Sequence, residues 1–464
     1  MSRPAAVVHR VIKAYDVRGL VGDEIDEPLV TDVGAAFARL LRDEGDGTQR
    51  VAVGYDMRES SPALAAAFAA GVTGQGLDVV RIGLASTDQV YFASGLLDCP
   101  GAMFTASHNP AAYNGIKLCR AAAKPVGRDT GLTAITDDVI AGVPPYDGAS
   151  GDIVDRDVLH DYGEFLRSLV DLSGMRPMRV AVDAGNGMAG HTTPAVLGPI
   201  ASITVEPLYF ELDGSFPNHE ANPLDPANLV DLQKHVRATS ADIGLAFDGD
   251  ADRCFVVDER GEPVPPSAVT ALVAARELQR EIGGTVIHNL ITSRAVPELV
   301  TERGGTPVRS CVGHSYMKAL MADTGAIFGG EHSAHYYFRD FWGADSGMLA
   351  ALHVLAALSE QHRPLSELMA DYQRYEPSGE INFAVADGQA CIEAVLKSLG
   401  TQIASIDHLD GVTVDLGEGA WFNIRMSNTE PLLRLNVEAR TKEMVDAIVE
   451  KIAAEITSHA GAST

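Results

Sequence analysis

The sequence has no window of 18 uninterrupted apolar residues and no C-x-x-C pair in its 464 residues. The first absence argues against a membrane-spanning helix, and the opening stretch MSRPAAVVHRVIKAYDVRG also lacks the apolar core and cleavage site of a secretory signal. The five cysteines lie far apart and are odd in number, which predicts free thiols in a reducing compartment. We therefore expect a cytoplasmic protein without a membrane partner.

Basic residues are also scarce. The chain has 36 lysines and arginines against 63 aspartates and glutamates, which gives a formal net charge of −27. A nucleic-acid backbone must be met by a basic face, so nucleic acid is not expected as a partner. A phosphate-binding site in such a protein must gather its own cations, and each basic motif is therefore informative.

Two common phosphate-binding devices are missing as well. The stretch GVTGQGLD over residues 71–78 lacks the third glycine of a dinucleotide fingerprint and the Gly-Lys-Ser/Thr of a P-loop. The sequence therefore supports neither an NAD-dependent nor a nucleotide-hydrolysing enzyme.

A chain of this length is too long for one hydrophobic core, so several domains are expected. Short β-branched runs alternate with Ala- and Leu-rich stretches of helical length, which predicts α/β domains with largely buried sheets. The predicted strands lie at 51–56, 179–185, 243–250 and 285–290, and the predicted helices at 61–76, 225–240 and 267–283.

Candidate linkers at residues 142–152, after Asp258 and at 371–380 are rich in Gly, Pro or charge. They divide the chain into four predicted domains: 1–150, 151–256, 257–370 and 371–464. The last domain differs from the others, because its strand patterns and a terminal helix from about Lys442 predict an antiparallel sheet with helices on one side.

The segment AFDGDADR places Asp248, Asp250 and Asp252 at alternate positions directly after an apolar strand. Carboxylates this dense repel one another unless a hard divalent cation lies among them, so the segment predicts a Mg²⁺ site. A calcium loop is one alternative, but its sixth position is Arg253 where such a loop needs Gly, and the flanks look like strands. A solvated acidic turn is the other alternative.

The segment MFTASHNPAAYNGIKL places Ser107, His108 and Asn109 on a turn after a short apolar strand. Ser107 could act as a nucleophile, although most serines in such turns only cap backbone groups. Lys117 favours a nucleophilic role for Ser107, because a cation ten residues further on could neutralise a phosphate carried by the serine.

Two further motifs offer polar side chains. KAYDVRG supplies Tyr15 and Arg18, which could equally lie on a surface turn. FGGEHSAHYYF supplies Glu331, Ser333 and His335, which suit sugar hydroxyls. A zinc site is the alternative for this second motif, but it lacks the H-E-x-x-H arrangement.

The last domain carries the segment WFNIRMSNTEPLLRLNVE, in which two arginines and several hydroxyl and amide groups flank a turn between strands. These residues are Arg425, Ser427, Asn428, Thr429 and Arg434. Guanidinium groups bind phosphate oxygens in pairs, so the segment predicts a phosphate site.

Together, KAYDVRG, TASHNP, DGDADR, GGEHSAH and RMSNTEP, in this order between residues 13 and 434, resemble the motifs of the α-D-phosphohexomutase superfamily. The resemblance covers nearly the whole chain. It implies an α/β protein of four domains around a central cleft: three related α/β domains with mixed sheets and a C-terminal α+β domain.

The resemblance also implies roles for individual residues. Ser107 would carry the phosphoryl group and, with Asp248, Asp250 and Asp252, would hold Mg²⁺. Acid and base candidates would be Arg18, His108, Lys117 and His335. Substrate contacts would come from Tyr15, Asn109, Arg253, His314 in VGHSYMK, Glu331, Ser333, Arg425, Ser427, Asn428, Thr429 and Arg434.

The implied activity is that of a phosphomannomutase, which interconverts mannose 6-phosphate and mannose 1-phosphate through a phosphoserine and supplies GDP-mannose synthesis. A hexose 1,6-bisphosphate would be both intermediate and activator. SNTEP and GEHSAH resemble the phosphomannomutase or dual phosphomannomutase/phosphoglucomutase branch, whereas Ile291 stands where dual-specificity relatives carry a lysine.

Several alternatives stay open. They are a dual enzyme that also acts on glucose 1- and 6-phosphate, a phosphoglucosamine mutase, a metal-dependent sugar phosphatase and a sugar-phosphate-binding protein without chemistry. Either a monomer or a homodimer is compatible with the sequence.

Overall fold

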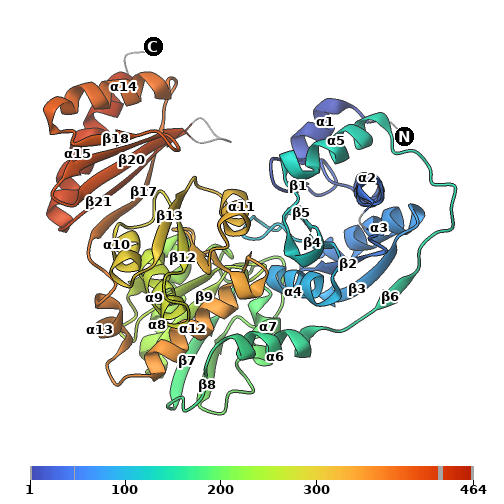
Figure 1. Ribbon diagram of the computed structural model, residues 1–464, viewed down its shortest axis with the longest axis horizontal. Helices are drawn as coiled ribbons and strands as arrows, with labels where there is room; N and C mark the ends of the chain where they lie inside the picture. Colours follow the sequence, from blue (N-terminus) through green and yellow to red (C-terminus); the bar gives the residue numbers. More distant parts are fainter. Residues whose placement is uncertain (1–2, 46, 427–431, 461–464) are drawn as a thin grey trace. The chain divides into compact units, whose positions relative to one another are not determined.

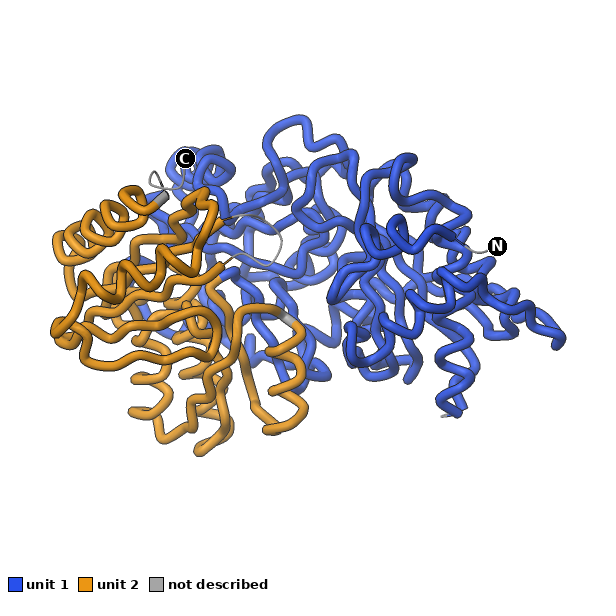
Figure 2. Tube along the Cα trace, turned by 90° about the horizontal axis from the view of Figure 1, so that it is seen from above, with its two compact units in different colours: residues 1–264, 333–366 blue, residues 265–332, 367–464 orange. Residues whose placement is uncertain are grey.

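The computed structural model describes residues 3–45, 47–426 and 432–460. It divides into two compact units, which Figure 2 shows in different colours. Unit 1 comprises residues 1–264 and 333–366, and unit 2 comprises residues 265–332 and 367–464. The predicted third domain, 257–370, is therefore divided between the two units.

The first sheet of unit 1 has six strands in the order β1-β5-β4-β2-β3-β6 (Figure 1). Their bounds are Val17–Leu20 (β1), Arg50–Tyr55 (β2), Asp78–Leu84 (β3), Gly101–Phe104 (β4), Tyr113–Cys119 (β5) and Ile153–Asp155 (β6). β2 is parallel to β3 and β4, whereas β5 is antiparallel to β1 and β4, so the sheet is mixed. β6 pairs with β3, and the sheet therefore extends beyond the predicted boundary at residue 150.

The helices of this part begin with clear sequence signals. They are α1 (Ala5–Val11), α2 (Glu27–Glu44), α3 (Ser61–Gly74), α4 (Thr87–Leu97) and α5 (Leu132–Ala141), with short 3₁₀ turns at Ala121–Ala123 and Arg128–Thr130. The Asp26 carboxylate accepts a hydrogen bond from the Leu29 N–H at 2.7 Å and caps α2, which ends at Gly45 with φ +69°.

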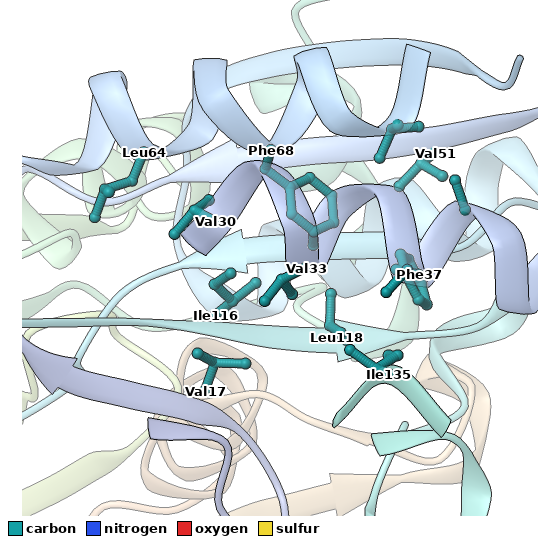
Figure 3. Close-up of a cluster of buried hydrophobic side chains, with 14 of the residues drawn as sticks. Val17, Val30, Val33, Phe37, Val51, Leu64, Phe68, Ile116, Leu118 and Ile135 are labelled. Atoms are coloured by element: carbon teal, nitrogen blue, oxygen red, sulfur yellow. The ribbon is translucent and has the colours of Figure 1, made fainter. Parts of the chain in front are cut away.

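The hydrophobic core of this part lies between α2, α3 and the strands (Figure 3). Phe68 of α3 is fully buried, and its ring centroid lies 5.5 Å from that of Phe104 in β4 and 6.1 Å from that of Phe37 in α2. Aromatic side chains of this size provide much of the burial that holds a sheet against its helices.

The second sheet of unit 1 has the order β11-β10-β9-β7-β8. Its strands are β7 (Met178–Asp183), β8 (Ile203–Leu208), β9 (Ile243–Phe247), β10 (Cys254–Val257) and β11 (Pro263–Val264), and its helices are α6 (Leu159–Leu169), α7 (Ala189–Val196) and α8 (Val230–Thr239), preceded by a 3₁₀ turn at Pro226–Leu229. Residues 248–253, called the acidic loop below, join the antiparallel strands β9 and β10. The turn after Asp258, expected as a linker, instead joins β10 to β11, so this sheet extends beyond residue 256.

Residues 333–366 complete unit 1. They form β15 (Tyr336–Phe338), antiparallel to β16 (Ala344–Asp345), a 3₁₀ turn at Arg339–Phe341 and the buried helix α12 (Gly347–Ser359). The Trp342 ring stacks on Phe165 of α6 with a centroid distance of 5.1 Å, so this segment packs on the second domain.

In unit 2, the central strand β12 is parallel to both of its neighbours, β13 and β14. These elements are β12 (Thr285–Asn289), β13 (Thr306–Ser310) and β14 (Phe328–Gly330), with helices α9 (Pro266–Arg280), α10 (Ala295–Glu302) and α11 (His314–Thr324); helix α13 (Leu365–Ala370) spans the division between the units.

The C-terminal sheet of unit 2 is antiparallel throughout, in the order β17-β21-β20-β19-β18, as the sequence predicts. Its elements are β17 (Glu376–Ala384), β18 (Ser405–Asp407), β19 (Val412–Gly417), β20 (Ala420–Met426), β21 (Leu432–Ala439), α14 (Gly388–Leu399), α15 (Lys442–Ala460) and a 3₁₀ turn at Gly400–Gln402. The linker expected at 371–380 is wrong in its second half, because β17 begins at residue 376.

The five cysteines carry free thiols, as predicted. Across the part of the chain that the structure describes, no helix combines the length and apolar character needed to cross a membrane.

The core predicts a mutational effect. We expect Phe68→Ala to lower the free energy of unfolding of the first α/β domain by about 3–5 kcal/mol, because it removes a buried ring and leaves a cavity. Hydrogen exchange of peptides from α2 and β2 would measure this change as a loss of protection. Leu96→Ala is the control, since Leu96 is 43% exposed; equal loss of protection in both variants would contradict the packing described.

Candidate active site

Ser107 lies on the loop between β4 and β5, in a strained backbone conformation with φ +49°. Its side-chain hydroxyl donates a hydrogen bond to Asp248 Oδ2 at 2.8 Å and lies 3.2 Å from His108 Nδ1. Ser107 is only 5% exposed. A hydroxyl held at a fixed position beside a carboxylate is a suitable acceptor and donor of a transferred group.

Gly249 allows the serine loop, residues 105–112, to approach the acidic loop. A Cβ atom at this position would lie 2.5 Å from the carbonyl oxygen of Ser107, which is closer than non-bonded atoms can pack. The structure therefore brings together two loops whose hydrogen-bonded residues, Ser107 and Asp248, are 141 positions apart in the sequence.

The carboxylates of Asp248, Asp250 and Asp252 lie on this acidic loop, with ligand oxygens within 4.8 Å of one another. All three side chains are buried, and Asp250 Oδ1 and Asp252 Oδ1 accept no hydrogen bond from the described residues. Oxygen atoms so arranged fit a hard divalent cation such as Mg²⁺. Asp248, Asp250 and Asp252 are thus residues that could hold a metal ion.

Two cations lie among these carboxylates. Lys117 Nζ is 2.7 Å from Asp250 Oδ2 and 2.6 Å from Asp252 Oδ2, and Arg253 Nε donates to Asp248 Oδ2 at 2.9 Å. Burial opposes the charge of Lys117, but Asp250 and Asp252 outweigh it and raise its pKa. Lys117 is therefore a charged group at neutral pH.

The carboxylates differ in their affinity for a proton. Burial raises the pKa of Asp248 to about 8, and the neighbouring carboxylates of Asp252 and Asp250 add to this effect against Arg253. Burial also opposes ionisation of Asp250, but Lys117 outweighs it and lowers the Asp250 pKa. A bound cation would add to the effect of Arg253 and favour the ionised form of Asp248.

The N-terminal motif lies beside the serine loop. Arg18 in β1 donates a short hydrogen bond to Asn109 Oδ1, and its Nη2 is 2.7 Å from Asp16 Oδ2. Tyr15, two residues before β1, is partly exposed. The structure thus brings together Arg18, a predicted acid/base candidate, and Asn109, a predicted substrate contact.

The histidine of GGEHSAH lies near the acidic loop. His335 Nε2 is 3.8 Å from Asp252 Oδ1, and its Nδ1 is 2.9 Å from the Ser333 hydroxyl. Ligand atoms of Asp252, His335 and Asp345 also lie within 4.8 Å of one another. Asp345 is therefore a neighbour of the site that the sequence analysis does not identify.

Arg58 is another residue that the sequence analysis misses. It is 1% exposed, is paired with Asp56, and donates hydrogen bonds to the carbonyl oxygens of Ser107, Asn109, Pro110 and Tyr113 at 2.7–3.0 Å. One guanidinium thus fixes the backbone of the serine loop. Its backbone partners lie 49–55 residues away in the sequence, so no local pattern pointed to this role.

Unit 2 holds the other predicted sugar-site residues. Glu331 is 2% exposed, and its Oε1 accepts hydrogen bonds from Asn289 Nδ2 at 3.2 Å and from the Gly313 N–H at 3.3 Å. His314 is the first residue of α11, and Ile291 is buried. The motif GGEHSAH is divided between the units, because Glu331 belongs to unit 2 and Ser333 to unit 1.

The predicted phosphate site has two opposed arginines. Arg425 in β20 pairs directly with Arg434 in β21, and like charges in this position repel each other. The Glu380 carboxylate lies 2.8 Å from Arg425 Nη2 and 3.6 Å from Arg434 Nη1. Buried Arg425 Nη1 has no hydrogen-bond partner among the described residues, and a guanidinium in this position could bind an anion. The predicted residues Ser427, Asn428 and Thr429 lie outside the described residues.

The chain is similar to known proteins along most of its length. Models of the phosphoglucomutase/phosphomannomutase family match along the chain: alpha/beta/alpha domain I at residues 9–142, domain II at 160–261, domain III at 265–375 and the C-terminal domain at 380–455. A protein named phosphohexose mutases from Xanthomonas campestris pv. campestris is 42% identical over 92% of this chain and 94% of its own length. The chain belongs to the phosphoglucomutase/phosphomannomutase family.

Other members of this family are also similar to the chain. A phosphomannomutase from Escherichia coli is 39% identical over 95% of this chain and 98% of that protein. The crystal structure of a phosphoglucomutase/phosphomannomutase family protein from Burkholderia thailandensis has a TM-score of 0.88 at 30% identity, covering 99% of this chain and 98% of that one. The protein is thus a phosphohexomutase, an isomerase with the four-domain fold of its family.

Lys117 provides a test of the charge balance in the site. We expect Lys117→Met to lower the free energy of unfolding by about 3–5 kcal/mol without metal, because Asp250 and Asp252 lose a partly buried partner. Added Mg²⁺ should restore more stability to this variant than to the wild type. Thermal unfolding with and without Mg²⁺ would measure both effects.

Lys442→Met is the matched control. Lys442 also pairs with a carboxylate, that of Asp446 at 2.8 Å, but both side chains are exposed. An exposed pair contributes little, so this variant should unfold like the wild type. Equal losses in the two variants would contradict the charge balance described.

Proposed function

We propose that the protein is a phosphomannomutase that interconverts mannose 6-phosphate and mannose 1-phosphate. The observation that carries this proposal is the hydrogen bond of 2.8 Å between the Ser107 hydroxyl and Asp248 of the acidic loop. It joins a candidate phosphoryl carrier to a candidate metal ligand. The relatives named phosphomannomutase, which are 37–39% identical over most of their length, support mannose as the sugar.

Asp248, Asp250 and Asp252 would hold Mg²⁺, with Ser107 as a further ligand. The ion would supply positive charge to the phosphoryl oxygens. Lys117 and Arg253 are within ion-pair distance of the same carboxylates and would supply further positive charge. Phosphoryl transfer depends mainly on positioning and charge neutralisation, and these residues provide both.

In the first half-reaction, the bond between the phosphorus and Ser107 Oγ would break and a bond to the free sugar hydroxyl would form. The hydroxyl proton would leave to a base, and Ser107 would regain a hydroxyl. The resulting hexose 1,6-bisphosphate would turn over and return its other phosphoryl group to Ser107. The same bisphosphate would phosphorylate a resting enzyme, and it is therefore the proposed activator.

The proton transfers need a group with a free lone pair. Lys117 is protonated, because its pKa is raised, and Arg18 does not lose its proton in proteins. These two residues would therefore act as cations. The neighbouring His108 would be neutral, because burial and the nearby cations Arg253 and Arg18 lower its pKa to about 2. His335 is the stronger base candidate, because a neutral imidazole can accept a proton at Nε2, the atom that faces Asp252.

The remaining predicted residues would bind substrate. Glu331, Ser333 and His314 would contact sugar hydroxyls, and Tyr15 and Asn109 would contact the sugar phosphate near the serine loop. The phosphate that does not react would lie on Arg425 and Arg434, with Ser427, Asn428 and Thr429. Because either phosphate of the intermediate can occupy this position, one site would serve both half-reactions.

We further propose a cytoplasmic location, in keeping with the free cysteines, and a role in supplying mannose 1-phosphate for GDP-mannose synthesis. The active form would be a monomer or a homodimer. We also propose the four domains predicted from the sequence, 1–150, 151–256, 257–370 and 371–464. The first two sheets extend past residues 150 and 256, to β6 and β11.

Assays with mannose 1-phosphate and glucose 1-phosphate test the function directly. With Mg²⁺ and glucose 1,6-bisphosphate present, we expect conversion of mannose 1-phosphate to the 6-phosphate without release of inorganic phosphate. Comparable turnover of glucose 1-phosphate would instead favour a dual-specificity enzyme. Phosphate release without isomerisation would point to a phosphatase, and no reaction of either sugar would contradict the proposal.

Ser107→Ala tests the phosphoryl carrier. We expect turnover to fall by more than about 10³-fold, because the variant has no hydroxyl to store the phosphoryl group, while substrate binding stays near normal. Intact-mass spectrometry after incubation with the bisphosphate should show one added phosphate on the wild type and none on the variant. The exposed Ser168→Ala serves as the control; a phosphorylated Ser107→Ala variant would exclude the assignment.

A further inference from the structure

The sequence around residue 87 contains a polar stretch that the proposed mechanism does not use. Ser86, Thr87, Asp88 and Gln89 begin helix α4, and each is at most 1% exposed. Four consecutive polar side chains are costly to bury unless their hydrogen bonds are satisfied by specific partners. The hydrogen-bond partners of these side chains therefore indicate which part of the protein the start of α4 holds in place.

Thr87 forms two hydrogen bonds to one residue of the acidic loop. Its hydroxyl donates to Asp250 Oδ2 at 2.5 Å, and its backbone N–H donates to the Asp250 carbonyl oxygen at 3.0 Å. The two residues are 163 positions apart in the sequence. Thr87 therefore fixes both the backbone and the side chain of Asp250.

These contacts distinguish the two carboxylate oxygens of Asp250. Oδ2 accepts hydrogen bonds from Thr87 and from Lys117, whereas buried Oδ1 has no hydrogen-bond partner among the described residues. A rotation of the carboxylate to another angle would break both bonds. Thr87 thus helps to hold Asp250 in the orientation that leaves one carboxylate oxygen available to a cation.

Asp88 holds Thr87 in place. Its carboxylate accepts hydrogen bonds from Tyr162 Oη of α6 at 2.8 Å, from Ser346 Oγ at the start of α12 at 2.6 Å, and from Ser86. The start of α4 cannot move away from the acidic loop without breaking these buried bonds. The position of Thr87 is therefore preset by two other parts of unit 1, α6 and the start of α12.

We propose that Thr87 is a positioning residue of the metal site, which orients Asp250 so that Oδ1 faces the ion. This inference rests on the proposed metal-binding role of Asp248, Asp250 and Asp252. Thr87 itself supplies no ligand. It contributes by removing the alternative orientation of Asp250, which makes metal binding more favourable.

Metal binding by the full-length protein tests the inference. Electron paramagnetic resonance can follow the titration of the metal-free protein with Mn²⁺, which accepts the same oxygen ligands as Mg²⁺. We expect Thr87→Val, which keeps the side-chain shape, to weaken Mn²⁺ binding by about 10–100-fold. Thr87→Ser keeps the hydroxyl and should bind Mn²⁺ almost as the wild type does.

Kinetics provide a second readout. In Thr87→Val, the Mg²⁺ concentration for half-maximal activity should rise by a similar factor, while kcat at saturating Mg²⁺ stays near that of the wild type. A general structural defect would instead lower kcat at every Mg²⁺ concentration. Thr136→Val is the matched control, because the Thr136 hydroxyl is buried in α5 and, among the described residues, donates its hydrogen bond to the Leu132 carbonyl oxygen of its own helix.

The outcomes separate this inference from the proposed function. If the wild type binds no Mn²⁺, the proposed metal site is wrong. If the wild type binds Mn²⁺ and Thr87→Val binds it equally well, the role of Thr87 is overturned. The same loss is expected in Thr87→Ala, so the inference can be judged even where the valine variant does not fold.

Discussion

The site depends on the balance of charge around three buried carboxylates. Asp248, Asp250 and Asp252 converge at one turn, and among the described residues Lys117 and Arg253 lie at direct ion-pair distance from them. Burial raises the pKa of Asp248, and the neighbouring carboxylates add to this effect. A divalent cation would oppose it, and a phosphoryl group on Ser107 would then add up to two negative charges. The proposed cation and phosphoserine would therefore stabilise each other in this setting.

The loops that carry these charges are held by buried groups outside them. Arg58 binds the carbonyl oxygens of the serine loop, and Thr87 binds the acidic loop. Each loop follows a strand of a mixed sheet, β4 in the first sheet and β9 in the second. The ends of these strands fix where the two loops begin. Catalysis by positioning requires this kind of support, because displacements of about 1 Å can already cost much of the rate.

The sequence predicted the chemistry better than the supporting contacts. Ser107 and the acidic loop could be identified because their patterns are local and follow apolar strands. Arg58 and Thr87 could not, because their partners lie 49 and 163 residues away and no local pattern links them. The short strands β6 and β11 were not predicted for a related reason: each becomes part of a sheet only through pairing with another strand.

The pairing of Arg425 with Arg434 has a consequence for ligand exchange. Glu380 already neutralises part of their charge, so an arriving anion must share the two guanidinium groups with a resident carboxylate. Such internal competition weakens attachment compared with a bare pair of arginines. Weak binding would suit the proposed bisphosphate intermediate, which carries two phosphate groups and would have to leave this site, reverse its direction and bind again before it escapes into solvent.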